Sequence, residues 1–355
     1  MKPTTYFYSI IIYFVMFIPF GYVHGASNSE GLRRQLAYQP FSEQSIWNTP
    51  LGQKAAFLSR DDAMSKMLHS DNVGGKSGSY AWIGYDATSI YYTSYKDPFV
   101  KWNYVGRSAT APWPYDTAIQ NDSVWLRTPK NVQFFGGTDN VAVIIDPSGK
   151  VAYEVWLGKY DALANVYNVQ YLVRVDLTST GIASGESRSE GVRAFGGSIL
   201  GGLIRCGELE SYRISHAVAI LVSQNQAKRG AGVDDQKVWP AMNTDGAGKN
   251  SYSGLVPIGQ LLAIPQSVDI SRLDLTPDGL ALATALQQFG GYVVDTATNT
   301  MSIGAIEHGC KVQSVKNLQH DVRSIRDVLL PVSNNTSKDI GGPGVRVADF
   351  PPTIK

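Results

Sequence analysis

Ionisable side chains follow a glycine-rich apolar run in the segment AFGGSILGGLIRCGELESYRISHAVAI, residues 194–220. Arg205, Glu208 and His216 lie within twelve positions of one another. A histidine can act as a general acid or base, and an arginine can neutralise the carboxylate of a uronic acid. The glycines are not followed by Lys-Ser or Lys-Thr, so this is not a phosphate-binding loop. These residue types favour acid–base chemistry on a glycan.

A further carboxylate, Glu154, lies inside the apolar segment 151–156, where an acidic side chain is uncommon. Glycoside hydrolysis requires two carboxyl groups about 5 to 9 Å apart, whereas β-elimination requires a base and a group that neutralises a uronate. We therefore expect Glu154, Glu208, His216 and Arg205 to be catalytic, with Glu154 opposite the other three, and both reactions stay open. The structural alternative pairs Glu154 with an arginine, bridges Arg205 to Glu208, and hydrogen-bonds His216 at the margin of the core.

Aromatic residues beside amides are the second signal of a glycan ligand. Sugars present C–H faces to aromatic rings and hydroxyl groups to neighbouring amides. Because most tryptophans of a β protein lie in its core, only some of the seven are expected to line a groove. The predicted substrate-binding residues are Trp47, Asn48, Tyr153 and Trp156.

The amino-acid composition limits which classes of partner and cofactor are expected. A formal net charge of +1 with 17% charged residues does not give the excess of basic residues that is typical of proteins that bind nucleic acid or an anionic membrane. Four histidines follow position 25, without an HExxH or CxxC motif, so no metal and no other cofactor are expected. The expected partner is a polysaccharide or oligosaccharide, and the sequence does not predict the oligomeric state.

The N-terminus predicts export. An uncharged apolar run from Tyr6 to Tyr22 is followed by Val23-His24-Gly25, which suits signal-peptide cleavage. We expect residues 1–25 to be removed and the mature chain to be secreted, in an extracellular or periplasmic location without a membrane anchor; a retained anchor is the alternative. In an exported chain, Cys206 and Cys310 are expected to form a disulfide bond, and buried free thiols are the alternative.

Short runs rich in Val, Ile and Tyr, separated by turn residues, predict a mostly β chain. Helices are expected at 51–69 and at 277–289, the second capped by Thr276 and ended by Gly290. Strands and helices do not alternate, which favours antiparallel sheets in one β-sandwich or jelly-roll-like domain, residues 26–332, with a few peripheral helices and an irregular C-terminal tail, residues 333–355. The expected strands are 89–95, 123–127, 140–146, 151–156, 169–176, 215–222 and 292–295. The strands 140–146 and 151–156 are expected to form a hairpin across the turn Pro147-Ser-Gly-Lys150, which Asp146 starts.

The order of these motifs resembles a family of exported bacterial proteins without an assigned activity. The shared features run from Phe41 to Pro50, through Tyr153-Glu154 and residues 196–216, to Val238-Trp-Pro240 and the strand at 292–295. Members carry a similar LxGLxRxxE stretch that ends in IxHA, and this chain has Gly201 where they have proline. The resemblance implies a single exported domain and marks Arg205, Glu208 and His216 as the polar positions of the motif.

Together these observations predict an exported polysaccharide-active protein with an aromatic-lined groove, most simply a glycoside hydrolase or a polysaccharide lyase. A non-catalytic, lectin-like carbohydrate-binding protein is the alternative, and a surface or matrix protein is a third possibility. Activity as an enzyme is the favoured hypothesis, and the particular glycan does not follow from the sequence.

Overall fold

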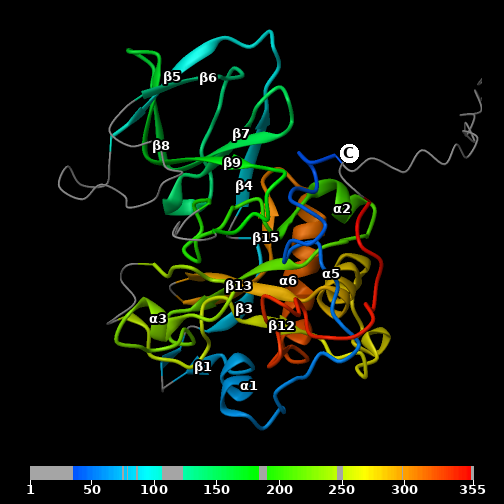
Figure 1. The fold of residues 1–355 in the computed structure, drawn as a ribbon. Helices are drawn as coiled ribbons and strands as arrows, with labels where there is room; N and C mark the ends of the chain where they lie inside the picture. The colour runs from blue at the N-terminus through cyan, green and yellow to red at the C-terminus, as the bar shows by residue number, and fades with distance from the viewer. Residues whose placement is uncertain are drawn as a thin grey trace, which may run out of the picture. The chain divides into compact units, whose positions relative to one another are not determined.

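The computed structural model describes residues 35–73, 76–77, 79–84, 87–105, 123–183, 190–245, 251–297 and 299–352. The predicted signal peptide and the last three residues of the predicted tail lie outside these ranges. Within the described ranges, strands outnumber helices, which confirms a mostly β chain (Figure 1). None of the helices found there has the length and apolar character needed to cross a membrane.

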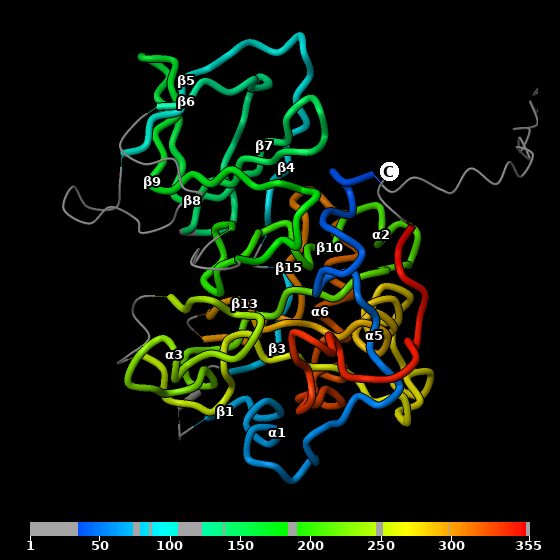
Figure 2. Tube along the Cα trace, in the orientation of Figure 1, coloured from blue at the N-terminus to red at the C-terminus, as the bar shows by residue number. Residues whose placement is uncertain are grey.

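An eight-stranded mixed sheet carries most of the first half of the chain (Figures 1 and 2). It contains the predicted hairpin, in which β7 (Ala142–Ile145) and β8 (Val151–Asp161) pair antiparallel. In the turn between them, the Asp146 carboxylate accepts a hydrogen bond from the Ser148 N–H. Asp146 is therefore a turn residue. The strands, in spatial order, are β10 (Leu203–Ile204), β15 (Ala305–Glu307), β4 (Ala87–Tyr92), β7 (Ala142–Ile145), β8 (Val151–Asp161), β9 (Val166–Asp176), β5 (Phe99–Tyr104) and β6 (Ser123–Arg127).

A six-stranded mixed sheet is built mainly from the second half of the chain. Its central strand β11 pairs with β13 in parallel and with β14 antiparallel. The strands, in spatial order, are β16 (Leu330–Pro331), β12 (Leu261–Ala263), β13 (Gly291–Ala297), β11 (Val218–Ser223), β14 (Thr300–Ile303) and β3 (Tyr80–Trp82). A separate short pair joins β1 (Asn72–Val73) to β2 (Lys76–Ser77).

The expectation of antiparallel pairing is wrong for several strands, because β4 pairs with β7, β5 with β9, and β11 with β13 in parallel. These partners are far apart in the sequence, and side-chain alternation within one strand says nothing about the direction of its neighbour. The sheets are therefore mixed, and a jelly-roll arrangement is not confirmed.

Helix α5 (Pro277–Gln288) confirms the second predicted helix. The Thr276 hydroxyl accepts a hydrogen bond from the Gly279 N–H, Pro277 occupies the first turn, and Gly290 follows with a φ of 76°. Helix α6 (Val312–Arg326), which is not among the helices expected from the sequence, packs against α5 beside the six-stranded sheet (Figure 1). Further α-helices of the described chain are α1 (Ala63–Leu68), α2 (Cys206–Glu210) and α3 (Val233–Gln236).

The first predicted helix, 51–69, is too long, because α1 begins only at Ala63. The Asp62 carboxylate accepts a hydrogen bond from the Met64 N–H and so caps the helix there. Upstream, Gly52 and Phe57 instead form isolated bridges with residues of the C-terminal segment. The segment 51–62 is therefore non-helical and consists of turns and isolated bridges.

Two apolar clusters fill the interior. The larger joins the six-stranded sheet to one face of the eight-stranded sheet, and the smaller covers the opposite face of the latter. Strand β7 shows why both form: Val143 and Ile145 point into the larger cluster, while Ala142 and Ile144 point into the smaller. An uninterrupted apolar strand is thus buried on both faces.

Candidate functional site

The carboxylate of Glu154 holds the glycine-rich loop by hydrogen bonds. Glu154 lies on β8 with no exposed surface, and it accepts hydrogen bonds from the Ser198 hydroxyl and from the N–H groups of Val192 and Ile199, at 3.1 Å and 3.0 Å. Burial raises the pKa of this carboxyl above its ordinary value, and these hydrogen bonds oppose the rise. Glu154 therefore faces loop backbone rather than a groove, and its partners are amides and a hydroxyl rather than an arginine.

The glycines at 201 and 202 let this loop pack against the core. A Cβ at Gly201 would lie 2.3 Å from the Trp47 ring, and one at Gly202, whose φ is 70°, would lie 2.4 Å from the Ala219 nitrogen. Trp47 is 2% exposed and packs edge-on against Phe195, with ring centroids 6.0 Å apart. Trp47 is thus a core residue, contrary to its predicted contact with substrate.

The other three predicted substrate-binding residues also have structural surroundings. Asn48 is 1% exposed, and its side-chain amide donates to the carbonyls of Pro40 and Ser42 at 2.8 Å and 3.0 Å. Tyr153 and Trp156 are half-buried on β8 and pack against the smaller and the larger apolar cluster, respectively. They do not line the groove described below.

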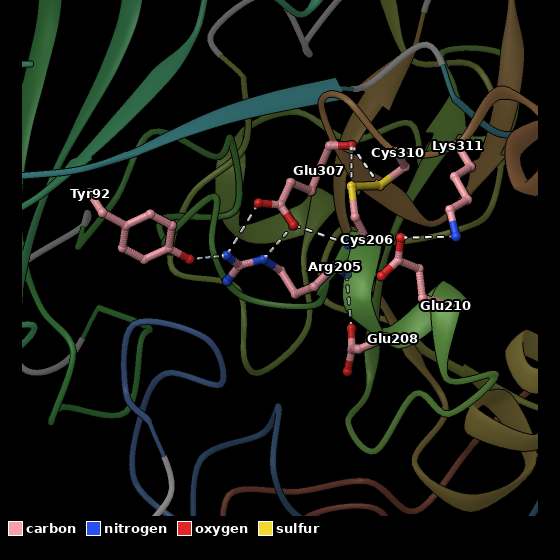
Figure 3. Close-up of a disulfide and its surroundings, with 8 residues drawn as sticks. All are labelled: Tyr92, Arg205, Cys206, Glu208, Glu210, Glu307, Cys310 and Lys311. Carbon is pink, nitrogen blue, oxygen red and sulfur yellow. Dashed lines mark hydrogen bonds and ion pairs between the residues drawn. A yellow bond between two sulfur atoms is a disulfide. The ribbon is translucent and has the colours of Figure 1, made fainter. Parts of the chain in front are cut away.

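Arg205 joins three parts of the chain, and Figure 3 shows its contacts with two of them, Tyr92 and Glu307. It is 2% exposed at the start of α2, and its Nε donates to Glu307 at 3.1 Å. Its Nη1 donates to the carbonyls of Ala37 and Tyr38, each at 3.0 Å, and its Nη2 donates to the Tyr92 hydroxyl. Because every nitrogen of the guanidinium has a partner, Arg205 holds the 37–38 backbone against α2.

Glu208 and His216 form a second buried pair beside Arg205. Glu208 accepts a hydrogen bond from the Arg205 N–H at 2.9 Å, and the same oxygen lies 3.1 Å from His216 Nε2. His216 Nδ1 donates to the Ala217 carbonyl at 2.8 Å. Burial alone would lower the pKa of His216, but the Glu208 carboxylate and the Ala217 carbonyl together outweigh burial and raise the pKa. Both ring nitrogens face acceptor oxygens, an arrangement that favours the protonated ring, in which no lone pair is available to act as a base.

The predicted strand 215–222 begins later than expected, because β11 starts at Val218. His216 therefore lies in the bend before the strand and not in the strand itself. The structure brings Arg205, Glu208 and His216 together, as expected, but all three are buried and paired. Glu154 does not share a surface with them.

The disulfide Cys206–Cys310 is confirmed, and it joins the first residue of α2 to the segment before α6 across 104 residues (Figure 3). The Cys206 N–H donates to Glu307 at 3.0 Å, so the covalent link lies beside the Arg205–Glu307 ion pair. The link stabilises the position from which Arg205 reaches the 37–38 backbone.

A groove of about 840 Å³, here called the α5 groove, lies over this buried cluster. Its walls are the exposed side of α5, the segments 35–39 and 212–215, and the C-terminal segment 348–352. Tyr38, Tyr212 and Phe350 line it with 37%, 56% and 44% exposure. This groove is not predicted by the sequence, because its walls come from four distant segments and none of them carries a recognised motif.

Tyr38 connects the groove with the buried cluster. Its ring lies 4.9 Å from the guanidinium carbon of Arg205, and it also lines a small cavity shared with His216. Burial, together with the Glu208 carboxylate, raises the pKa of Tyr38 to about 12. Its phenol is therefore a hydrogen-bond donor at neutral pH.

Tyr212 has a backbone conformation that favours glycine. It follows the end of α2 with a φ of 52°, and the next N–H, of Arg213, donates to the Glu208 carbonyl at 2.9 Å. Left-handed backbone costs a non-glycine residue about 1–2 kcal/mol. A large exposed side chain is thus present where glycine would be the lower-energy choice.

Comparisons with known proteins give no further assignment: no family model, no curated protein and no solved structure matches this chain. The resemblance to the exported bacterial family stays a prediction. In the part of the chain that the structure describes, no group of three or more His, Cys, Asp and Glu side chains is arranged to hold a metal ion.

Proposed function

We propose that this protein is an exported polysaccharide-binding protein and that its glycan lies in the α5 groove. The observation that carries the proposal is Tyr212, an exposed ring held on left-handed backbone at the groove wall. Strained residues persist where the surrounding structure enforces them, and they concentrate at functional sites. The ring supplies the flat apolar surface to which the C–H face of a sugar binds.

The remaining lining complements a sugar in the same way. Tyr38 and Phe350 add aromatic surface, and Gln35, Gln39 and Gln288 add amide donors and acceptors. This combination of apolar surface with a few polar groups is typical of small-molecule and oligosaccharide sites.

Arg205, Glu208 and His216 act in this proposal as positioning residues. Arg205 binds the carbonyl oxygens of residues 37 and 38, and Glu208 binds the backbone at the start of α2. They therefore fix the backbone of Tyr38 and of helix α2, which precedes Tyr212. A rigid wall reduces the conformational entropy that would be lost on binding.

Glycan cleavage is the second candidate, favoured by the joint presence of Tyr38 and Asp349 in the lining. A protonated phenol can donate a proton to a leaving oxygen, and a carboxylate can act as a base or nucleophile. Asp349 is the one carboxylate among the lining residues described, so the two-carboxylate hydrolysis expected for Glu154 and Glu208 has no counterpart here. Binding without cleavage is accordingly the better-supported function.

A panel of plant, algal, fungal and bacterial polysaccharides tests both candidates. We expect retention of at least one polysaccharide, with binding weakened by Tyr212→Ala or Phe350→Ala and unchanged by Tyr95→Ala, an exposed tyrosine outside the groove. New reducing ends without an unsaturated product would establish hydrolysis, and unsaturated uronate ends would establish elimination. If no polysaccharide binds, or if the groove variants bind like wild type, the proposal is wrong.

The disulfide supports export, since such bonds persist in oxidising compartments. Fractionation of the native host, with sequencing of the mature N-terminus, should find the chain outside the cytoplasm and beginning near residue 26. Recovery of the full chain from the cytoplasm, with both cysteines reduced, would contradict export.

A further inference from the structure

A second groove, of about 690 Å³, lies at the β5–β8–β9 end of the eight-stranded sheet. None of its lining residues lines the α5 groove. It is bordered by the loop 128–134 on one side and by β8 and the turn after it on the other. We propose that this groove, here called the tyrosine-stack groove, is a non-catalytic binding site for an acidic oligosaccharide rich in uronic acid.

A column of three aromatic rings ends in this groove. Trp102 is fully buried and stacks on Tyr167 with ring centroids 4.3 Å apart and an interplanar angle of 16°. Tyr160 lies against Tyr167 with centroids 4.7 Å apart, and its hydroxyl donates to Asn165 at 2.8 Å. Tyr160 is 42% exposed, so a ring fixed by two interactions presents open surface to the groove.

Phe134, at the base of the groove, helps to hold these rings in place. Phe134 meets Tyr167 edge-on with centroids 5.9 Å apart, and it occupies the space beside Gly158. A Cβ at Gly158 would lie 2.2 Å from the Phe134 ring, so a larger residue there would displace the floor. The aromatic surface is therefore organised before any ligand arrives, which favours binding of a stiff sugar ring.

The charge of the lining selects an anion. Lys130 and Lys159 are exposed and line the groove, and no ion pair joins either lysine to another described residue. The described lining contains no carboxylate. The nearby Asp161 carboxylate accepts hydrogen bonds from the N–H groups of Leu163 and Ala164, at 3.0 Å and 3.1 Å. Two lysines beside an exposed ring and several amides match a sugar that carries carboxylates, and the lack of a lining acid excludes two-carboxylate hydrolysis here.

Titration calorimetry with a galacturonate hexamer tests the proposal, with its fully methyl-esterified form as the uncharged match. We expect 1:1 binding of the acid form, and binding of the ester about tenfold weaker. The Lys130→Ala/Lys159→Ala double variant should lose a similar factor, whereas Lys150→Ala, at an exposed lysine outside the groove, should not. Raising the ionic strength should weaken binding of the acid form only.

Ring and peptide controls complete the test. Tyr160→Ala should abolish binding, while Tyr160→Phe, which keeps the ring, should bind within about threefold of wild type. Because Lys130 and Lys159 are exposed, their substitution should not affect folding, so the lysine double variant still tests the proposal if Tyr160→Ala does not fold. The proposal fails if the acid hexamer does not bind, if the ester binds equally well, if the lysine double variant binds like wild type, or if a glutamate hexapeptide binds more tightly than the sugar.

Because Tyr212→Ala and Phe350→Ala alter only the α5 groove, their effect on the same titration separates the two sites. Unchanged binding of the hexamer by these variants is expected. If these variants lose that binding and the lysine double variant keeps it, the acidic ligand binds in the α5 groove and this proposal is wrong.

Discussion

Replacing Tyr212 with glycine should weaken glycan binding without a large loss of stability. Glycine removes the cost of left-handed backbone, about 1–2 kcal/mol, but adds about 0.4–1 kcal/mol of unfolded-state entropy. The ring is 56% exposed, and loss of its buried part costs about 1–2 kcal/mol. These contributions nearly cancel, so the free energy of unfolding should stay within about 1 kcal/mol of wild type, while the affinity for the retained polysaccharide should fall by about tenfold or more.

Urea unfolding and calorimetry on the same preparations measure both quantities. Asp274→Gly is the matched control, because Asp274 is exposed with a φ of 51° and lies outside the α5 groove. It should match wild type in binding and be at least as stable. A loss of more than about 2 kcal/mol in Tyr212→Gly would show that the ring is mainly a packing element, and unchanged affinity would refute its role in the site.

Three further predictions concern the support beneath the groove. Gly202→Ala should lower the free energy of unfolding by about 2–5 kcal/mol, because it adds left-handed strain and overpacking. The control Gly149→Ala, at a φ of 68° but with open space around it, should lower that free energy by only about 1 kcal/mol. Equal urea midpoints for the two variants would contradict this prediction. Reduction of Cys206–Cys310 should lower stability by up to about 4–5 kcal/mol, given its 104-residue separation, and a melting temperature unaffected by reductant would contradict this. Because the folded-state pKa of His216 is raised, its stabilisation is complete below the unfolded pKa of 6.5 and is lost as pH rises through the folded pKa. His216→Gln should therefore flatten the fall in urea midpoint that wild type shows as pH rises above 6.5, and an equally steep fall in the variant would contradict this.

Local signals in the sequence were sufficient for several elements. The cap at Thr276, the proline in the first turn and the following glycine predicted α5 almost to the residue, and the Asp-Pro-Ser-Gly turn predicted the β7–β8 hairpin. Helix α6 had an equally local signal that was missed: Val315, Leu318, Val322 and Ile325 recur at helical spacing. Parallel pairing, in contrast, depends on which distant strand is adjacent, and alternation within one strand carries no such information.

The polar motif was found from the sequence, but its role could not be, for a physical reason. Arg205, Glu208 and His216 are close in the chain, yet the groups that decide their chemistry are distant: Glu307 and Tyr92 bind Arg205 from 102 and 113 positions away. A buried charge is stable only when it is paired and hydrogen-bonded, so crowded ionisable residues identify a place where desolvation is compensated. Whether that place reacts with a ligand depends on which polar atoms remain unpaired after folding. Here the three side chains use their hydrogen bonds to hold backbone, and the exposed rings of the α5 groove are left to contact the ligand.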